Sequence, residues 1–357
     1  MTAHVTPVAI RAVGAKRLGA LAVVGLVVAF SLSSTLVKRA HTAGVLVAFW
    51  RLTMVSVIWN LYLRATGRRV TTADVRQAFI PGIFFGLNLA IFFAGATKNS
   101  VANAALIGSL SPFLIVPLGA YMFKEHINPR ALLFALAAFG GLAIVLYNAP
   151  PGGDATTRGN VFGVLAMLLW TGYVTSTRHF RRNMDVAVFM ATISPIAAVA
   201  VLPLAITNGD GFGMSSTGWT YTVVLTLLTG VAAHGLMVFA QKTIPIGTIG
   251  ITQVIQPPLA FVWSFLILGE RLNGWQIVGI TIVLIGLIAF LLLNQRMNRA
   301  TAAARSTAAQ RGRMPARNVE RPKSRPWVED HLDHRDRQAD STESAQGRRC
   351  RGVANPE

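Results

Sequence analysis

Uncharged polar side chains within long apolar stretches are the residues of this sequence best suited to bind a ligand. Thr248, Thr252 and Gln256 recur every four residues, with Gln253 alongside, so they share one face of a helix. Amides and hydroxyls donate and accept hydrogen bonds and stay uncharged at neutral pH. The stripe therefore predicts either hydrogen bonds between helices or the wall of a polar cavity that binds a solute.

Similar residues in other apolar stretches extend this candidate lining. Trp170 and Tyr173 share a helix face, and an aromatic ring with a polar atom suits an amphipathic ligand; the alternative is a belt at the membrane interface. For the amides and serines, the alternative is hydrogen bonding between helices. The candidate substrate-binding residues are Ser34, Asn88, Asn103, Ser111, Trp170, Tyr173, His234, Gln241, Gln253 and Gln256.

Two residues within the apolar stretches can carry a charge. His234 has an ordinary pKa of about 6.5, which makes a proton a candidate coupling partner; the alternative is a neutral imidazole bonded to a neighbouring helix. Arg51 is interpreted as a side chain that snorkels to the lipid headgroups. Attraction of an anionic substrate by Arg51 is the secondary hypothesis.

The middle parts of the apolar stretches contain no Asp or Glu. Every Asp and Glu before the C-terminal tail falls at the end of a stretch or in a loop, and these residues are Asp74, Glu125, Asp154, Asp185, Asp210 and Glu270. Proton relays inside membranes usually use Asp, Glu or His. This distribution argues against a proton antiporter for organic cations that depends on a carboxylate.

No catalytic set is recognisable in the sequence. The sole cysteine, Cys350, cannot form an intramolecular disulfide, and the seven histidines have no metal-ligand spacing. Paired carboxylates and a nucleophile with its base do not occur at useful spacings. We therefore expect no metal, no cofactor and no enzymatic activity.

Membrane-spanning helices must position the polar residues. Hydrophobic residues make up 53% of the chain and charged residues 13%, and about 20 apolar residues suffice to cross a bilayer. Ten spans are expected, near 18–37, 44–63, 78–97, 101–123, 131–148, 160–178, 187–206, 219–240, 247–268 and 275–294. The predicted fold class is an all-α integral membrane protein.

These spans form a duplication. Pro112, Glu125, Asn128 and Gly141 recur 145 positions later as Pro257, Glu270, Asn273 and Gly286. Gly19, Thr35, Lys38 and Phe49 match Gly159, Thr175, Arg178 and Phe189 at a spacing of 140. Each copy holds five spans, an odd number, so the second copy must enter the membrane from the opposite side. The two halves are thus predicted to be inverted, and Pro112 and Pro257 are candidate hinges because proline breaks a helix.

Positive charges near the span ends predict the orientation. With the N-terminus inside, thirteen Lys and Arg lie in the inner segments and five in the outer loops, before the tail is counted. Both termini are therefore expected in the cytoplasm, with the protein in the cell membrane. The first apolar stretch has the basic flank of a signal peptide, but its counterpart around Trp170 lies mid-chain, so we expect it to be retained as a span.

The sequence beyond Asn294 changes in composition. It holds 14 Lys and Arg against eight Asp and Glu and hardly any apolar run, which predicts a disordered basic tail. The segment from Arg296 to Arg325 is a candidate for contact with anionic lipid headgroups, the alternative being a solvated tail with no partner. No nucleic acid is expected as a partner, because aromatic residues that could stack on bases are limited to Trp327.

Two segments carry a resemblance to a known family. They run from Ala104 to Gly141, with Pro112 and Lys124-Glu125, and from Gly247 to Gly286, with Pro257 and Gly269-Glu270-Arg271. Together with the duplication over residues 18–294, they resemble the EamA family of the drug/metabolite transporter superfamily. The resemblance implies a ten-helix carrier that moves small metabolites by alternating access, often as an exporter, from a central cavity. Small multidrug pumps of that superfamily carry the mid-membrane carboxylate that this sequence lacks.

The predicted organisation has five parts. They are a cytoplasmic N-terminus (1–17), a first EamA-like repeat (18–148), an external linker (149–159), a second repeat (160–294) and the tail (295–357). The leading functional hypothesis is a carrier for an amino acid or a related small metabolite, with export favoured. A flippase for a lipid-linked substrate is the alternative, and an intramembrane enzyme ranks last. A proton or a counter-substrate is a candidate coupling partner.

Overall fold

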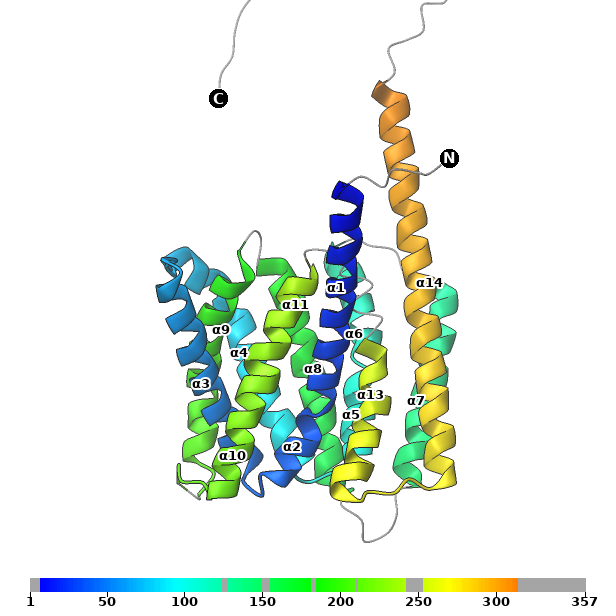
Figure 1. Cartoon of the computed structure of the whole chain (residues 1–357). Helices are drawn as coiled ribbons and strands as arrows, with labels where there is room; N and C mark the ends of the chain where they lie inside the picture. The colour runs from blue at the N-terminus through cyan, green and yellow to red at the C-terminus, as the bar shows by residue number, and fades with distance from the viewer. Residues whose placement is uncertain are drawn as a thin grey trace, which may run out of the picture. The chain divides into compact units, whose positions relative to one another are not determined.

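The fold is helical throughout the part of the chain that the structure describes. In the computed structural model these residues are 7–123, 128–148, 155–180, 184–209, 211–241 and 253–313 (Figure 1). The chain divides into two units, Met1–Thr307 and Ala308–Glu357, and the first contains the membrane part. The predicted all-α class is confirmed.

The first copy of the repeat folds into seven helical segments. They are α1 (Pro7–Ser31), α2 (Ser33–Arg39), α3 (Gly44–Ala65), α4 (Thr72–Ala96), α5 (Val101–Ser109), α6 (Pro112–Phe123) and α7 (Pro129–Tyr147). The first predicted span is divided into α1 and α2, and the fourth into α5 and α6. This copy therefore supplies five spans, as expected.

The second copy contains two π-helical segments, η1 and η3, and one 3₁₀ segment, η2. Its elements are α8 (Thr157–Phe180), α9 (Val186–Ile206), α10 (Ser216–Leu225), η1 (Thr226–Ala232), α11 (Ala233–Gln241), η2 (Gln253–Ile255), α13 (Gln256–Trp263), η3 (Ser264–Leu268) and α14 (Gly274–Arg313). The eighth span runs continuously through α10, η1 and α11, and the ninth through η2, α13 and η3.

Eight helices in the described ranges are long and apolar enough to cross a membrane. The two other predicted spans are α8 and the ninth. Helix α8 has 24 residues but carries a polar and aromatic face, which lowers its mean hydropathy. The ninth is present as the shorter apolar helix Gln256–Leu268, and its predicted beginning lies outside the described residues. The protein is thus a multi-pass membrane protein.

The duplicated asparagines begin the fifth helix of each copy. Asn128 is the N-cap of α7, and its side chain accepts a hydrogen bond from the backbone N of Arg130. Asn273 does the same for α14, where Oδ1 accepts from Gln276 N at 2.8 Å. A side chain at this position satisfies a backbone donor that the helix leaves unpaired, which explains why both copies have Asn there.

Contacts between α7 and α14 confirm that the halves are inverted. A Cβ on Gly141 would lie 2.7 Å from the carbonyl oxygen of Gly279, and a Cβ on Gly286 would lie 2.7 Å from that of Phe134. Gly279 is the counterpart of Phe134 at the repeat spacing of 145, so exchanging the copies exchanges these two contacts. The earlier residue of α7 meets the later residue of α14, so the two helices are antiparallel and their copies have opposite directions in the membrane. Figure 1 shows α7 and α14 side by side.

Three apolar clusters hold the helices together. One lies mainly among α3, α4 and α9, the second among α5, α6, α7 and α14, and the third between α1 and α11. The outward faces expose large apolar side chains, such as Leu133 and Leu136, each 68% exposed. Such a surface suits lipid and not water.

Candidate functional site

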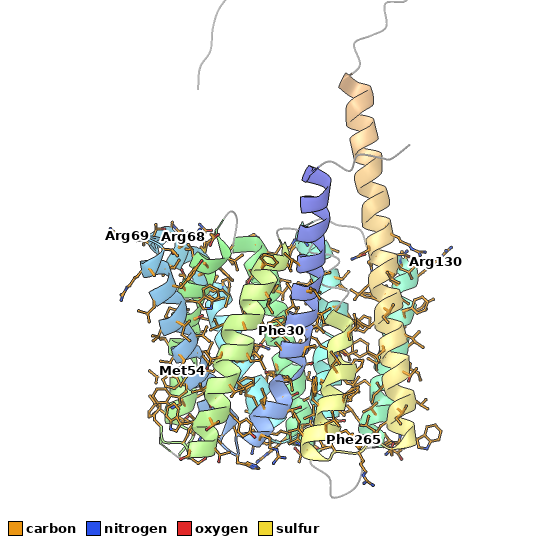
Figure 2. The ribbon with its side chains drawn as sticks, viewed as in Figure 1. Phe30, Met54, Arg68, Arg69, Arg130 and Phe265 are labelled. Atoms are coloured by element: carbon orange, nitrogen blue, oxygen red, sulfur yellow. The ribbon has the colours of Figure 1, made fainter. Side chains whose placement is uncertain are left out.

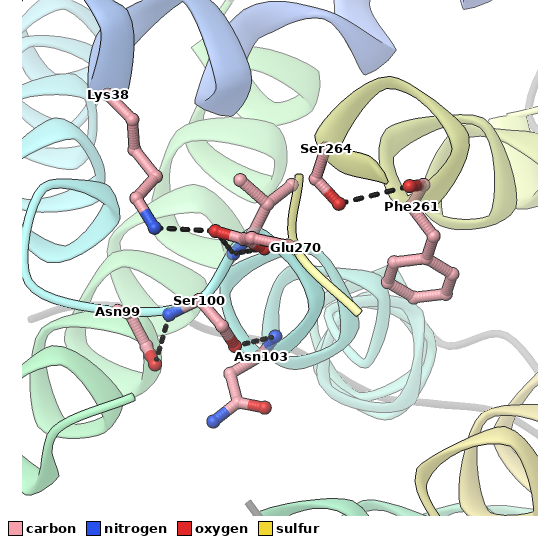
Figure 3. Close-up of polar contacts among 8 residues, drawn as sticks. Lys38, Asn99, Ser100, Asn103, Phe261, Ser264 and Glu270 are labelled. Carbon is pink, nitrogen blue, oxygen red and sulfur yellow. Dashed lines mark hydrogen bonds and ion pairs between the residues drawn. The ribbon is translucent and has the colours of Figure 1, made fainter. Parts of the chain in front are cut away.

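An ion pair ties the two halves together at one end of the bundle. Lys38 is in the last turn of α2, and its Nζ lies 2.6 Å from Oε1 of Glu270, which follows η3 (Figure 3). Oε2 of Glu270 also accepts a hydrogen bond from the backbone N of Val101, the first residue of α5, at 3.0 Å. One carboxylate thus joins α2 and α5 of the first half to η3 of the second. We call these three residues the Glu270 closure.

Local sequence places Glu270 at this point. Gly269 ends η3 in the left-handed conformation, with φ of 72°, which a glycine adopts at little cost. The carboxylate then faces the N-terminus of α5, where unpaired backbone N–H groups favour a negative charge. The Lys38 and Glu270 side chains are only 11% and 15% exposed, so solvent screens this pair less than a surface pair.

Asn103 lies beside the Glu270 closure. The residue is fully buried, and its Nδ2 lies 3.4 Å from Oδ1 of Asn160, which also accepts from Nδ2 of Asn99 at 2.9 Å. Among the residues that the structure describes, the buried Oδ1 of Asn103 has no hydrogen-bond partner. This predicted site residue therefore links α5 to α8 near the end of the bundle.

An aromatic group lies between α4 and α8. The rings of Trp170 and Tyr173 are 5.2 Å apart, and Tyr173 is 5.1 Å from Phe85. Both α8 residues are half-buried and lie well inside the helix, which argues against an interfacial belt. Asn88 donates from Nδ2 to the carbonyl of Ala166 at 2.7 Å, so its amide bonds between the same two helices.

His234 belongs to a third group, on α1, α11 and α13. Its Nδ1 lies 2.8 Å from the carbonyl oxygen of Thr229, and since a carbonyl only accepts, Nδ1 carries the hydrogen. The bond stays within its own span, and the contact with the neighbouring helix is an edge-on packing against Phe30 at 5.3 Å. Figure 2 shows Phe30 part-way along α1. Next to it, Ser31 Oγ accepts from Trp263 Nε1 at 2.9 Å, which joins α1 to α13.

The remaining predicted site residues fall into two sets. Ser34, Ser111 and Gln256 are described, the serines buried and Gln256 half-buried as the first residue of α13. The side chains of Gln241 and Gln253, and all of Thr248 and Thr252, lie outside what the structure describes. The predicted stripe in the ninth span is therefore represented by Gln256 alone.

Both candidate hinge prolines stand at helix breaks. Pro112 begins α6 and has no N–H to donate to the carbonyl of Gly108, four residues earlier. That carbonyl accepts from Ser111 N instead. Pro257 is the second residue of α13, after the 3₁₀ segment η2. The breaks predicted from sequence are present at equivalent places in the two halves.

The interpretation of Arg51 as a snorkelling residue is wrong. The side chain is 4% exposed and lies inside the bundle, where Nε donates to Thr229 Oγ1 at 3.1 Å and the guanidinium lies 5.7 Å from the centre of the Phe93 ring. Contacts with α4 and η1 hold the group in place. Snorkelling would require it to point along the helix to the headgroups.

Sequence reasoning missed the pairing of Lys38 with Glu270. A signal was present, because both residues belong to the duplicated set and follow the first and ninth predicted spans, which end on the same face of the membrane. Phe30, Phe85 and Trp263 were also missed, and an apolar or aromatic residue in an apolar stretch gives no sign of its role.

Duplicated inverted halves, broken helices at equivalent prolines and a closure between the halves define a class of membrane transporter. The chain belongs to the EamA-like transporter family, whose model matches residues 17–147 and 157–292. It is a transporter and not an enzyme.

Two relatives are named for the solute that they transport. The chain is 22% identical over 205 residues to a riboflavin transporter from Brucella anthropi, a match that covers 55% of this chain and 70% of that protein. It is 27% identical over 120 residues to a pseudopaline exporter from Pseudomonas aeruginosa, covering 32% of this chain and 42% of the exporter. A solved crystal structure matches with a TM-score of 0.55 and 19% identity, over 80% of this chain and 98% of the other, which shows the fold alone.

Proposed function

We propose that this protein is a secondary carrier that exports a small metabolite, an amino acid or a related compound, across the cytoplasmic membrane by alternating access. The observation that supports this most directly is the Glu270 closure. It joins one half to the other at one end of the bundle through one ion pair and one backbone hydrogen bond. In the orientation that the positive charges predict, this end faces outward.

Such a closure suits a carrier because it can open. A carrier must expose its site to each side in turn, so the contacts that seal one side must break and re-form. Separated charges regain their hydration, which offsets much of the attraction lost when the pair breaks. The helix breaks at Pro112 and Pro257 are the proposed hinges for this motion.

The candidate substrate-binding residues support a polar or amphipathic solute. Trp170 and Tyr173 offer rings with polar atoms, and Gln256 offers an amide. Of the two named relatives, the pseudopaline exporter supports export as the first hypothesis. A flippase for a lipid-linked substrate remains the second candidate, because the same fold can admit a substrate from the bilayer.

The decisive experiment measures efflux of radiolabelled amino acids and small metabolites from preloaded proteoliposomes. We expect saturable efflux that a counter-substrate or an imposed pH gradient accelerates, and reduced efflux for Gln256→Ala. Arg68→Gln is the matched control, because Arg68 and Asp185 form an exposed ion pair outside the closure. Absence of transport for every solute, together with movement of a fluorescent lipid-linked substrate between leaflets, would replace the carrier with the flippase.

A further inference from the structure

Arg51 is the charged residue placed most unusually in this protein. It lies seven residues into α3, which is about 10 Å from the start of the helix at ~1.5 Å per residue. Its side chain is 4% exposed. A buried arginine in a membrane span is costly unless charges or hydrogen bonds compensate it, and such residues commonly mark substrate pathways.

The protein uses little of the hydrogen-bonding capacity of Arg51. A guanidinium has five N–H donors. In the described part of the chain, its hydrogen bonding is limited to Nε, which donates to Thr229 Oγ1 at 3.1 Å. The guanidinium carbon lies over the ring of Phe93, 5.7 Å from its centre, and the ring accepts no conventional hydrogen bond. The donors of both Nη atoms are therefore left to a partner that is not one of these residues.

Neighbouring oxygens already take part in other hydrogen bonds. The Thr229 hydroxyl donates to Leu225 O at 2.8 Å, so it serves Arg51 only as a single acceptor. The carbonyl of Thr229 accepts from His234, and the carbonyl of Gly230 accepts from Trp59 Nε1 at 3.4 Å. Thr229 and Gly230 belong to the π-helical segment η1, and π-helical segments are frequent at functional sites.

The carboxylates in the described part of the chain interact with groups other than Arg51. Asp74 completes the capping box of α4, Asp185 pairs with Arg68, and Glu270 holds the closure with Lys38. The other acidic residues before the tail lie in segments between the predicted spans. Arg51 thus has no carboxylate partner among the residues that the structure describes, and the nearby group that can also become cationic is His234.

We propose that Arg51 binds the carboxylate of the transported metabolite, so that the substrate is an organic acid or a zwitterionic amino acid. This inference rests on the proposed carrier function. The planar fork of the two Nη atoms matches the two oxygens of a carboxylate, and a carboxylate supplies the acceptors and the charge that the protein does not. Thr229 of η1 and Phe93 of α4 hold the guanidinium group in position.

The test uses purified full-length protein and pairs of probes that differ only in the acid group: leucine with leucinamide, benzoate with benzamide, and succinate with succinamide. Thermal stabilisation by each probe reports binding, because a ligand that binds the folded state raises its stability. We expect the acids to bind at least about 10-fold more tightly than the amides. Proteoliposome efflux of the labelled acids then checks that the bound compounds are transported.

Variants at Arg51 separate a binding role from a structural one. Arg51→Lys keeps the charge but loses the fork, and we expect at least about 10-fold weaker binding of acids. Arg51→Met should lose the preference for acids while the ligand-free protein unfolds at the same or a higher temperature, since an uncompensated buried charge is gone. Arg64→Gln, at an exposed position of the same helix, should change neither property.

Each result has a defined meaning. Tight binding and transport of amides or of neutral and cationic solutes, with no preference for acids, would overturn the carboxylate site and leave the carrier intact. Unchanged acid preference in Arg51→Lys would also overturn the site. If Arg51→Met fails to fold, the probe pairs and Arg51→Lys still decide. No binding or transport of any acid would overturn the carboxylate site, and the leaflet assay with a lipid-linked substrate then decides between carrier and flippase.

Discussion

Lys38 and Glu270 are separated by 232 residues in the sequence, and their charged atoms lie 2.6 Å apart. The same carboxylate accepts from Val101 N, so its loss would remove two contacts between the halves at once. The Glu270 closure is therefore the point where a small chemical change should have the largest effect on the relation between the halves.

Removal and exchange of the charges of Lys38 and Glu270 test the closure. Lys38→Gln and Glu270→Gln should each lower the free energy of unfolding by about 1.5–3 kcal/mol, the usual contribution of a hydrogen bond to a charged group, and should reduce saturable efflux. The double variant Lys38→Glu/Glu270→Lys should recover part of the efflux, because the ion pair re-forms while the bond to Val101 N does not. Thermal unfolding and proteoliposome efflux measure the two effects.

The exposed pair of Arg68 and Asp185 is the control for the charge exchange. Its side chains are 49% and 53% exposed, and a surface pair contributes only about 0–1 kcal/mol. Swapping those charges should leave efflux unchanged. Equal effects of the two swaps would show that the closure has no special role in the transport cycle.

Adjacent glycines on α7 provide a test of the inverted helix pair. Gly141→Ala should destabilise the protein by about 1–3 kcal/mol, because its new Cβ would overlap the backbone of α14 at Gly279. Gly140→Ala meets nothing within 4 Å, so it should be neutral or stabilise the helix by up to about 1 kcal/mol. Thermal unfolding of the two variants gives the comparison, and similar losses for both would contradict the close contact.

Much of this architecture could be predicted from the sequence. The spacing of 145 and the odd number of spans were enough to predict inversion, because a membrane allows a chain only two directions. The duplicated Asn128 and Asn273 and the two prolines marked real helix starts and breaks. These signals are local, since a cap or a proline acts on the backbone next to it.

The site was predicted less well, because contacts between distant residues have no local signal. Asn103 looked like a lining residue and joins α8 near the closure, and Asn88 bonds the backbone of α8. Arg51 was expected at the headgroups, but its partners Thr229 and Phe93 come from other spans. An amide or a cation in an apolar stretch needs a partner, yet the sequence does not say which helix supplies it.

The hinge proposal predicts a kinetic effect. Pro112→Ala and Pro257→Ala restore a backbone donor at each break and should stiffen the fourth and ninth spans, which lowers the maximal efflux rate while substrate binding stays within about 2-fold. Pro203→Ala, at an exposed position within α9, is the control and should leave the rate unchanged. Unaltered rates in both hinge variants of folded protein would remove the hinge role.

The aromatic group on α8 should contribute to substrate binding. Trp170→Ala removes a ring that packs on Tyr173, and we expect the substrate concentration for half-maximal efflux to rise about 10-fold, with a smaller rise for Trp170→Phe. Trp275→Ala is the control, because Trp275 is 64% exposed at the start of α14. Equal responses of Trp170→Ala and Trp275→Ala would contradict a role of Trp170 in substrate binding and support the interfacial-belt interpretation.

Orientation decides whether the Glu270 closure seals the outside or the inside of the membrane. Figure 2 places Arg68, Arg69 and Arg130 at one end of the bundle, and the positive-inside rule assigns that end to the cytoplasm. Cys350 is the sole cysteine, so Cys350→Ser gives a cysteine-free background. A membrane-impermeant maleimide should label Arg158→Cys in intact cells and Arg130→Cys only after permeabilisation. The reverse pattern would place the closure on the cytoplasmic side, and its opening would then admit the solute from the cytoplasm instead of releasing it outside.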